Sequence, residues 1–541
     1  MKKRYITLFS VLIGTVACMA QTTNDTINRM VLVESTYNPI ITGAVKRNFI
    51  PEAAKPTMNK EQIIYADEGI DLTYFDRKAN PAPTVAIMPK KSTPGYAHIG
   101  YGNYNNLSGL AAYKFRFNEN GDLAIHTHID GWNGDLKLSN GTEWRSQFYD
   151  MGLRADCNIR LGNATFNAGT HTAHYSYNYL AASIPDDKED APQHADKIGV
   201  YISCKGAFKE DYRYQATIHY THFGRSTYFA ERVPHGENHF YGEMSFDMDF
   251  HDLGVGSVQV RSDMLTYQGL TNYSNYHSLE VTPRWNYRYE KLHLVGGFNM
   301  SFLTGKYIKT PLQISPECSI SYVSGTLFTA KLTVDGGRDI NTFSRLHTRS
   351  PYWASEEQLR PTYTFLNAHL GSDIRIMEGL HLHLGGGYKL MSDALFETAI
   401  DSAGITYTGI TNHNAHVTTI DARISYNYKN RVNLSAKEAY YHWTLKGNRA
   451  LLARTPKLES DINVRVCIMP NLHAYTNLRW ITFTDTNEQS IVDWSLGTQY
   501  SLNKRLTLFL DAHNLLNHHH QYFTGYPSQG FNVLLGAICK F

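Results

Sequence analysis

From about residue 96 to the C-terminus, apolar and polar residues alternate in long segments of about ten to fifteen residues. In VDWSLGTQYSL (492–502), for example, Val492, Trp494 and Leu496 fall on one face, and polar residues and glycine fall on the other. Successive side chains of a β-strand point to opposite sides of the sheet. The pattern therefore predicts strands with one apolar face and one polar face.

Three features favour a transmembrane β-barrel over a water-soluble sandwich. The strands are longer than the usual five or six residues or so, and Tyr and Trp gather near their ends, as in membrane barrels. The connections also alternate between short and long. Short turns are predicted at 118–122, 162–163, 209–211, 290–291, 377–379, 429–430, 469–471 and 503–504, and longer links near 181–193, 227–237, 340–361, 394–414, 445–459 and 518–529. We therefore predict an antiparallel barrel with short periplasmic turns and long extracellular loops.

Counting back from the C-terminus gives about 22 strands, with 20 as the alternative. The expected starts are 96, 107, 123, 144, 164, 194, 213, 238, 257, 276, 292, 315, 327, 362, 380, 415, 431, 460, 471, 490, 505 and 531. An even number leaves both ends of the barrel on the periplasmic side. A closed ring satisfies every backbone group within lipid.

Composition agrees with a β-rich chain. The 541 residues include 37 Tyr and 40 Gly, charged residues make up only 18%, and after residue 20 no apolar run is long enough for a spanning helix. Without residues 1–20 the chain has 48 basic and 49 acidic residues, so no global charge favours nucleic acid. Five widely spaced cysteines without a CxxC pair are expected to be free thiols.

The N-terminus has the pattern of an export signal. Lys2, Lys3 and Arg4 precede a short apolar stretch, and a small-residue cleavage site ends at Ala20. Lipid attachment at Cys18 is the alternative, although the residues before it lack the usual leucine. Residues 1–20 are thus predicted to be a cleaved signal peptide, and residues 21–95 a short periplasmic or lumen-lying segment. The barrel (96–541) is expected in the outer membrane of a Gram-negative bacterium.

The chain ends on a strand pattern, FNVLLGAICKF (531–541), with its last aromatic residue at the carboxyl end. Phe531, Val533, Leu535 and Phe541 share one face. In a barrel this strand would pair with the first strand near residue 96, so that no edge remains. We predict that Phe541 lies at the periplasmic rim and that this face resembles the assembly signal read by the barrel-assembly machinery.

The last segment, about residues 490–541, resembles the end of a TonB-dependent outer-membrane receptor. It contains Asn514-Leu515-Leu516-Asn517, then Gly525-Tyr526-Pro527, then a terminal Phe541. The resemblance implies a 22-stranded barrel that takes up or binds a ligand. Members normally also carry an N-terminal plug domain, and residues 21–95 are too short for one of about a hundred residues or more. The plug is therefore predicted to be missing.

Within that short segment, Met30, Val31, Leu32, Val33 and Glu34 form an apolar stretch that could contact TonB. The alternative is an ordinary β-edge or a lumen-lying segment. Because a barrel of this width must be filled, the occupant is expected to be folded-in loops, residues 21–95 or another protein.

Motifs of catalysis are not found. The sequence has no GxSxG elbow, no HExxH helix and no phosphate-binding glycine loop, so neither an enzyme nor a cofactor is predicted, and a barrel lipase is a remote alternative. Histidine is abundant, with 25 copies. The pairs His126/His128 and His381/His383 could be lumen ligands of a metal or haem, or simply polar wall residues. The run 518–520 is expected to be a solvated loop.

Two functions remain open. The first is uptake or binding of a ligand by a receptor-like barrel, with outer-membrane lipid and TonB as partners. The alternative is a non-transporting structural subunit of a larger outer-membrane complex, in which the loops and the N-terminal segment contact other subunits.

Overall fold

The computed structural model describes residues 94–541 except 139–140, 181–192, 210, 229–231, 271, 307–309, 356, 403–404 and 448. The predicted signal peptide with Cys18, the stretch Met30–Glu34 and nearly all of the segment 21–95 lie outside the described residues. The description therefore concerns the predicted barrel.

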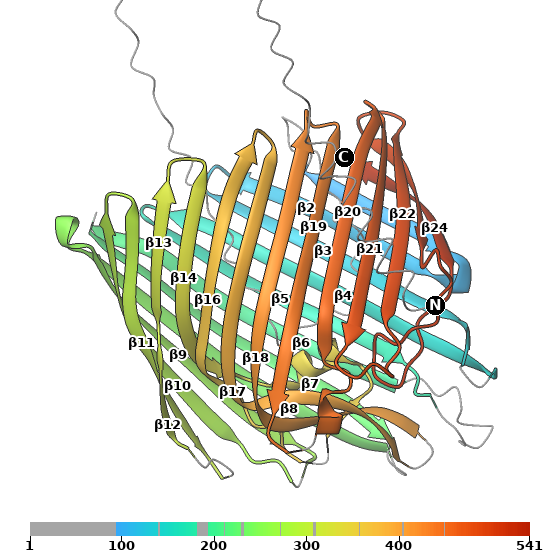
Figure 1. Cartoon of the computed structure of the whole chain (residues 1–541), viewed down its shortest axis with the longest axis horizontal. Helices are drawn as coiled ribbons and strands as arrows, with labels where there is room; N and C mark the ends of the chain where they lie inside the picture. Colours follow the sequence, from blue (N-terminus) through green and yellow to red (C-terminus); the bar gives the residue numbers. More distant parts are fainter. Residues whose placement is uncertain are drawn as a thin grey trace, which may run out of the picture. The chain divides into compact units, whose positions relative to one another are not determined.

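The described residues form antiparallel strands with a few short helical turns (Figure 1). The first half contains β1 (Gly95–Gly102), β2 (Leu107–Asn118), β3 (Gly121–Lys137), β4 (Glu143–Leu161), β5 (Ala164–Tyr177), β6 (Gln193–Lys209), β7 (Tyr212–Tyr228), β8 (Arg232–Asp249), β9 (Val255–Gln268), β10 (Tyr276–Tyr289) and β11 (Leu292–Gly305). The second half contains β12 (Leu312–Pro316), β13 (Cys318–Ser324), β14 (Phe328–Asp339), β15 (Trp353–Ala354), β16 (Thr362–Met377), β17 (Leu380–Ser402), β18 (Ile405–Tyr428), β19 (Val432–Leu445), β20 (Pro456–Met469), β21 (Leu472–Phe483), β22 (Ile491–Ser501), β23 (Leu506–His513) and β24 (Asn532–Lys540). The helical elements are α2 (Phe343–Arg349) and the 3₁₀ turns η1 (Asn103–Asn105), η2 (His251–Leu253) and η3 (Arg449–Leu452).

These strands form a barrel of 22 wall strands, as predicted. Over the described residues 24 strand segments are present. However, β12 and β13 both pair with β11 and are two parts of one wall strand, separated at Glu317. The two-residue β15 is not part of the wall sequence, because it adds in parallel to β18. The wall therefore has 22 strands.

The barrel closes between its first and last strands. β1 pairs with β24 from Tyr96↔Lys540 to Gly102↔Leu534. The closure ends in two backbone hydrogen bonds, in which Gly95 N–H donates to Phe541 O (2.7 Å) and Phe541 N–H donates to Gly95 O (3.0 Å). The terminal residue is thus a member of the ladder, which confirms the predicted pairing and leaves no open edge here.

The two faces of the wall differ as the alternation predicts. Leu535 of β24 is 62% exposed and points outward, in register with exposed Tyr101 of β1, and Phe541, which follows β24, is 51% exposed. Polar and charged residues such as Asp421 of β18 occupy the opposite, lumen-facing positions, next to exposed Ile420 on the outer face. Within the described residues, no helix has the length and hydropathy needed to cross a membrane.

Strand starts agree with the prediction within four residues for 20 of the 22 wall strands, and two starts were wrong. The predicted long link at 394–414 is instead the top of the β17–β18 hairpin, which is paired up to Ser402↔Ile405. Likewise β7 and β8 continue through most of 227–237. Both hairpins extend because the outer parts of their strands pack against a loop inside the barrel, described next.

Candidate functional site

The connection between β14 and β16 folds into the lumen, and we call residues 340–361 the inward loop. Its helix α2 begins after Thr342, whose Oγ1 accepts from Arg345 N–H at 3.2 Å, a typical N-cap contact. The wall supplies a second partner at this end, since Glu237 Oε1 of β8 accepts from Phe343 N–H at 2.8 Å. After α2, β15 pairs with Thr408 and Gly409 of β18. The loop is thus bound to the wall at both of its ends.

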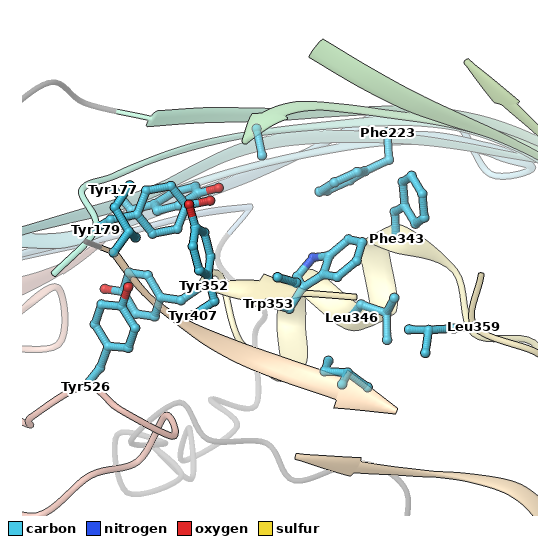
Figure 2. Close-up of a cluster of buried hydrophobic side chains, with 14 residues drawn as sticks. Tyr177, Tyr179, Phe223, Phe343, Leu346, Tyr352, Trp353, Leu359, Tyr407 and Tyr526 are labelled. Carbon is cyan, nitrogen blue, oxygen red and sulfur yellow. The ribbon is translucent and has the colours of Figure 1, made fainter. Parts of the chain in front are cut away.

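The inward loop is packed in a group of buried aromatic side chains, which we call the aromatic cluster (Figure 2). Tyr352 stacks on Tyr526 with ring centroids 3.5 Å apart and planes 5° apart. Tyr177 meets Tyr352 edge-on at 5.8 Å, and Tyr179 meets Tyr407 at 5.1 Å. All five rings are at most 4% exposed. The end of β5, the inward loop, β18 and the loop 514–531 therefore share one core inside the barrel.

Polar contacts hold the same segments together. Arg349 of α2 forms an ion pair with Glu397 of β17 at 2.5 Å, and Thr524 donates to the other oxygen of Glu397 at 3.0 Å. On the opposite side, Arg225 Nη2 donates to Trp353 O at 2.6 Å, and its guanidinium lies 4.0 Å from the Trp353 ring centroid. Removing one member of such a buried pair leaves an uncompensated charge, so these contacts fix the position of the loop.

Burial also sets the protonation of the loop tyrosines. Desolvation raises the pKa of Tyr352 and of Tyr526 far above that of a free phenol. Both hydroxyl groups therefore stay protonated, and that of Tyr526 donates to Thr406 O. The tyrosine hydroxyl groups therefore add no negative charge to the aromatic cluster.

Below the aromatic cluster, the lumen wall carries a near-balanced set of charges. A cavity of about 330 Å³ is lined by acidic residues of β8, β10 and β14 and by basic residues including Arg261, Arg284 and Lys389. Arg261 contacts Asp263 at 2.9 Å, and Arg284 contacts Glu317 at 3.1 Å. Charged groups of this kind favour contact with water, so the wall suits a polar solute better than an apolar one.

The predicted pair His381/His383 lies on β17 at lumen-facing positions. His383 Nδ1 is 2.9 Å from Asp373, and His383 Nε2 is 3.3 Å from Asp421. His369 of β16 contacts the other oxygen of Asp421 at 2.9 Å. One carboxylate thus joins two histidines, and sequence reasoning missed both His369 and Asp421. The strand register would have found them, because β16 and β18 flank β17 directly.

Glycine makes room for this network. A Cβ on Gly385 would lie 2.7 Å from Asp421 Oδ1 and 2.9 Å from the His369 ring. Real Cβ atoms do not approach so closely, so the LGGGYKL segment needs glycine here for close approach rather than for a turn.

The other predicted pair lies on β3. His128 Nε2 is 3.2 Å from buried Asp150 of β4, whereas His126 is exposed, as is His381 on β17. β3 and β17 are separated along the wall, so the structure does not bring the two pairs together. Among the described residues, no group of three or more His, Cys, Asp or Glu is arranged to hold a metal ion. A ligand role for His126, His128, His381 and His383 stays a prediction.

The expectation of a solvated loop at 518–520 was wrong for His520. Its side chain is 1% exposed and meets the Tyr522 ring edge-on at 4.6 Å. Burial lowers the pKa of His520 from 6.5 to about 4, so the imidazole is neutral near pH 7. The loop 514–531 is therefore packed in the barrel mouth, where its apolar contacts outweigh the polar character of the sequence.

Comparison with known proteins identifies the barrel fold. No protein-family model and no curated protein sequence matches the chain. Solved structures do match. The copper transporter OprC has a TM-score of 0.63 and 12% identity over 83% of this chain and 80% of that chain. The FrpB iron transporter of Neisseria meningitidis has a TM-score of 0.65 and 10% identity over 84% and 82%. A ferric enterobactin receptor (PfeA) of Pseudomonas aeruginosa, in complex with enterobactin, has a TM-score of 0.64 and 11% identity over 83% and 81%. The chain thus has the fold of TonB-dependent outer-membrane receptors.

Proposed function

We propose that the protein is an outer-membrane receptor that binds a polar ligand at its extracellular mouth and takes part in its uptake. The observation that carries the proposal is the inward loop. It fills the mouth of a receptor-type barrel above a hydrated, charged lumen.

The receptor fold supports this proposal, because the similar structures are two metal transporters and a siderophore receptor. We further propose that uptake is coupled to TonB through Met30–Glu34. TonB would pair with this stretch as a neighbouring β-strand, through the backbone groups of Val31 and Val33. Proline at these positions has no N–H to donate and would prevent the pairing.

The test compares growth on limiting nutrients, one at a time, for the gene deletion and for strains carrying Val31→Pro with Val33→Pro. Thr22→Pro with Thr23→Pro is the matched control in the same segment. We expect the deletion and the valine double variant to lose uptake of one nutrient, and the threonine double variant to keep it. Normal uptake by the valine variant would reject TonB coupling. Two results together would reject the receptor function in favour of a structural subunit. The deletion strain would grow normally on every nutrient, and the wild-type protein would co-purify with fixed subunits.

A further inference from the structure

The hydrogen-bonded wall of the barrel is interrupted between β12 and the outer part of β14. β13 pairs with β14 from Ser324↔Phe328 to Cys318↔Val334. Beyond that point β14 pairs only with β16, up to Asp339↔Thr362, and β12 pairs only with β11. Within the described residues no ladder pair joins Leu312–Pro316 to residues 335–339. We call this interruption the β12–β14 gap.

Side chains span the gap where the backbone does not. Arg338 of β14 donates from Nε to Ser301 Oγ of β11 (2.7 Å) and from Nη2 to Gln313 Oε1 of β12 (2.5 Å). Its backbone N–H donates to Glu280 Oε1 at 2.9 Å, in place of a strand partner. Side-chain contacts can exchange with a ligand or water without breaking a ladder. The gap is therefore the part of the wall where a sideways opening disturbs the fewest backbone hydrogen bonds.

Cavities lie on this gap, and Arg338 lines two of them. One is the 330 Å³ lumen cavity described above, and the other has a volume of about 530 Å³. The larger volume falls within the range of about 300–1,000 Å³ that is usual for small-molecule sites. Arg338 thus lies between the charged lumen and the second cavity.

The second cavity joins positive charge to apolar surface. Arg338, Arg360 and Lys446 line it, against a single carboxylate, Asp393, which Arg360 contacts at 2.7 Å. Lys446 forms no ion pair within the part of the chain that the structure describes. This leaves an excess of positive charge in the cavity, which an anionic group would balance.

The remaining lining is apolar and reaches the outer face of the wall. Phe365 and Leu390 line the cavity and are 41% and 36% exposed, and Ile314, on the β12 side of the gap, is 59% exposed. These side chains belong to the lipid-facing surface. A hydrocarbon chain that lay along them would leave the cavity directly into the bilayer.

From the interrupted ladder, the excess positive charge and the apolar exit, we infer that the β12–β14 gap binds an anionic amphiphile. Its negatively charged head group contacts Arg338 and Lys446, and its hydrocarbon chain lies over Phe365 and Leu390 toward the membrane. This chemistry is shared by free fatty acids and by anionic lipids of the surrounding bilayer. The site is separate from the proposed receptor function, and would stand if that function were rejected.

The test uses the purified full-length protein in neutral detergent micelles, with the fluorescent fatty acid cis-parinaric acid as the probe. Wild-type protein should bind it saturably, and its uncharged methyl ester at least tenfold more weakly. Lys446→Gln should weaken binding about threefold or more, and Arg338→Gln about tenfold or more. Arg213→Gln is the matched control, because it removes a charge from β7, away from the lining, where Arg213 has only a distant partner at 3.9 Å.

A heat-modifiable gel shift shows that each variant is folded. Arg338→Gln loses several contacts and could fail to fold. Lys446→Gln breaks no ion pair of the described residues, so it keeps the test decisive in that case. Equal affinity of wild type and folded Lys446→Gln, or equal affinity for acid and methyl ester, would overturn the inference. In nanodiscs, loss of probe binding when phosphatidylglycerol is included would identify bilayer lipid as the occupant. Unchanged probe binding there would assign the site to free amphiphiles.

Discussion

Replacing Tyr352 by alanine should detach the inward loop while the 22-stranded wall stays intact. The Tyr352 side chain is 2% exposed and contacts Tyr526, Tyr177 and Phe523. Truncating a buried aromatic side chain to alanine costs about 3–5 kcal/mol. Part of this is the ring–ring contribution of roughly 0.5–1.5 kcal/mol per pair. The loop has few strand hydrogen bonds of its own, so the loss falls on loop docking rather than on the wall.

A loss of about 3–5 kcal/mol raises the population of the detached loop by roughly two to three and a half powers of ten. Hydrogen exchange followed by mass spectrometry on peptides covering 340–361 should show it as much faster exchange of α2 and β15. Peptides from the β3–β4 wall should exchange at the wild-type rate. Tyr500→Ala is the matched control, since Tyr500 is 44% exposed on the outer face.

A disulfide provides the reciprocal test. Ser350 Oγ, at the end of α2, and Thr408 Oγ1 of β18 are 2.9 Å apart, so cysteines at these two positions can reach each other. Adding Ser350→Cys and Thr408→Cys to Tyr352→Ala should restore slow exchange under oxidising conditions and not under reducing ones. Unchanged exchange of the loop in Tyr352→Ala, or equal acceleration in the wall peptides, would refute the reasoning.

Four further outcomes are expected. Glu237→Ala should leave an α2 amide without its acceptor and destabilise that helix by about 1–3 kcal/mol, seen as faster exchange limited to α2. The folded pKa of His520, about 4, lies below its ordinary value of 6.5, so docking of 514–531 should be full above pH 6.5 and weaken down to about pH 4. The docking equilibrium constant should change by at most about tenfold per pH unit. His520→Gln should remove this pH dependence, measured as the rate of proteolysis of the loop against pH. Gly385→Val should crowd the lumen network and cost about 1–3 kcal/mol, measured as a lower midpoint of heat modification. Deletion of Phe541 should lower the amount of folded barrel in outer-membrane fractions more than the activity of each folded molecule, and normal levels would contradict its role as an assembly signal.

The alternation of side chains was enough to predict the barrel. Over most of its length a wall strand buries neither face in a shared core. The pattern of its residues there depends only on lipid outside the barrel and water inside it, and neighbouring residues of one strand are enough to show it. The predicted long link at 394–414 was wrong because the strands there do not lie between lipid and water. Phe396 of β17 and Ile410 of β18 are buried, at 2% and 1% exposure, against elements from elsewhere in the chain. These parts of β17 and β18 do not separate lipid from water. Their sequence therefore lacks the alternation of a wall strand and resembles that of a loop.

The candidate site could be predicted only in part, for a related reason. The pair His381/His383 was visible because two lumen positions of one strand are two residues apart. The residues that complete the network, His369 and Asp421, come from neighbouring strands, and only the register brings them close. The aromatic cluster depends on longer separations still, such as Tyr177 with Tyr352. Nothing local marks such residues, because an aromatic side chain in a long loop is equally compatible with an exposed position.

The mouth and the β12–β14 gap share only the C-terminal end of the inward loop, because Arg360 and Pro361 line the second cavity. The mouth is occupied by the inward loop through buried aromatic contacts and the Arg349–Glu397 ion pair, which do not involve β12. The β12–β14 gap is spanned by Arg338, which contacts β11 and β12 but no residue of the aromatic cluster. Arg360 is held by Asp393 of β17 and Asn412 of β18 rather than by Tyr352. Substitutions at the two places should therefore have nearly additive effects, because they remove different contacts. Tyr352→Ala should change loop exchange without changing cis-parinaric acid binding, and Lys446→Gln should do the reverse. Coupling between the two readouts would mean that the wall moves as one unit, and the separate assignment of mouth and gap would then be wrong.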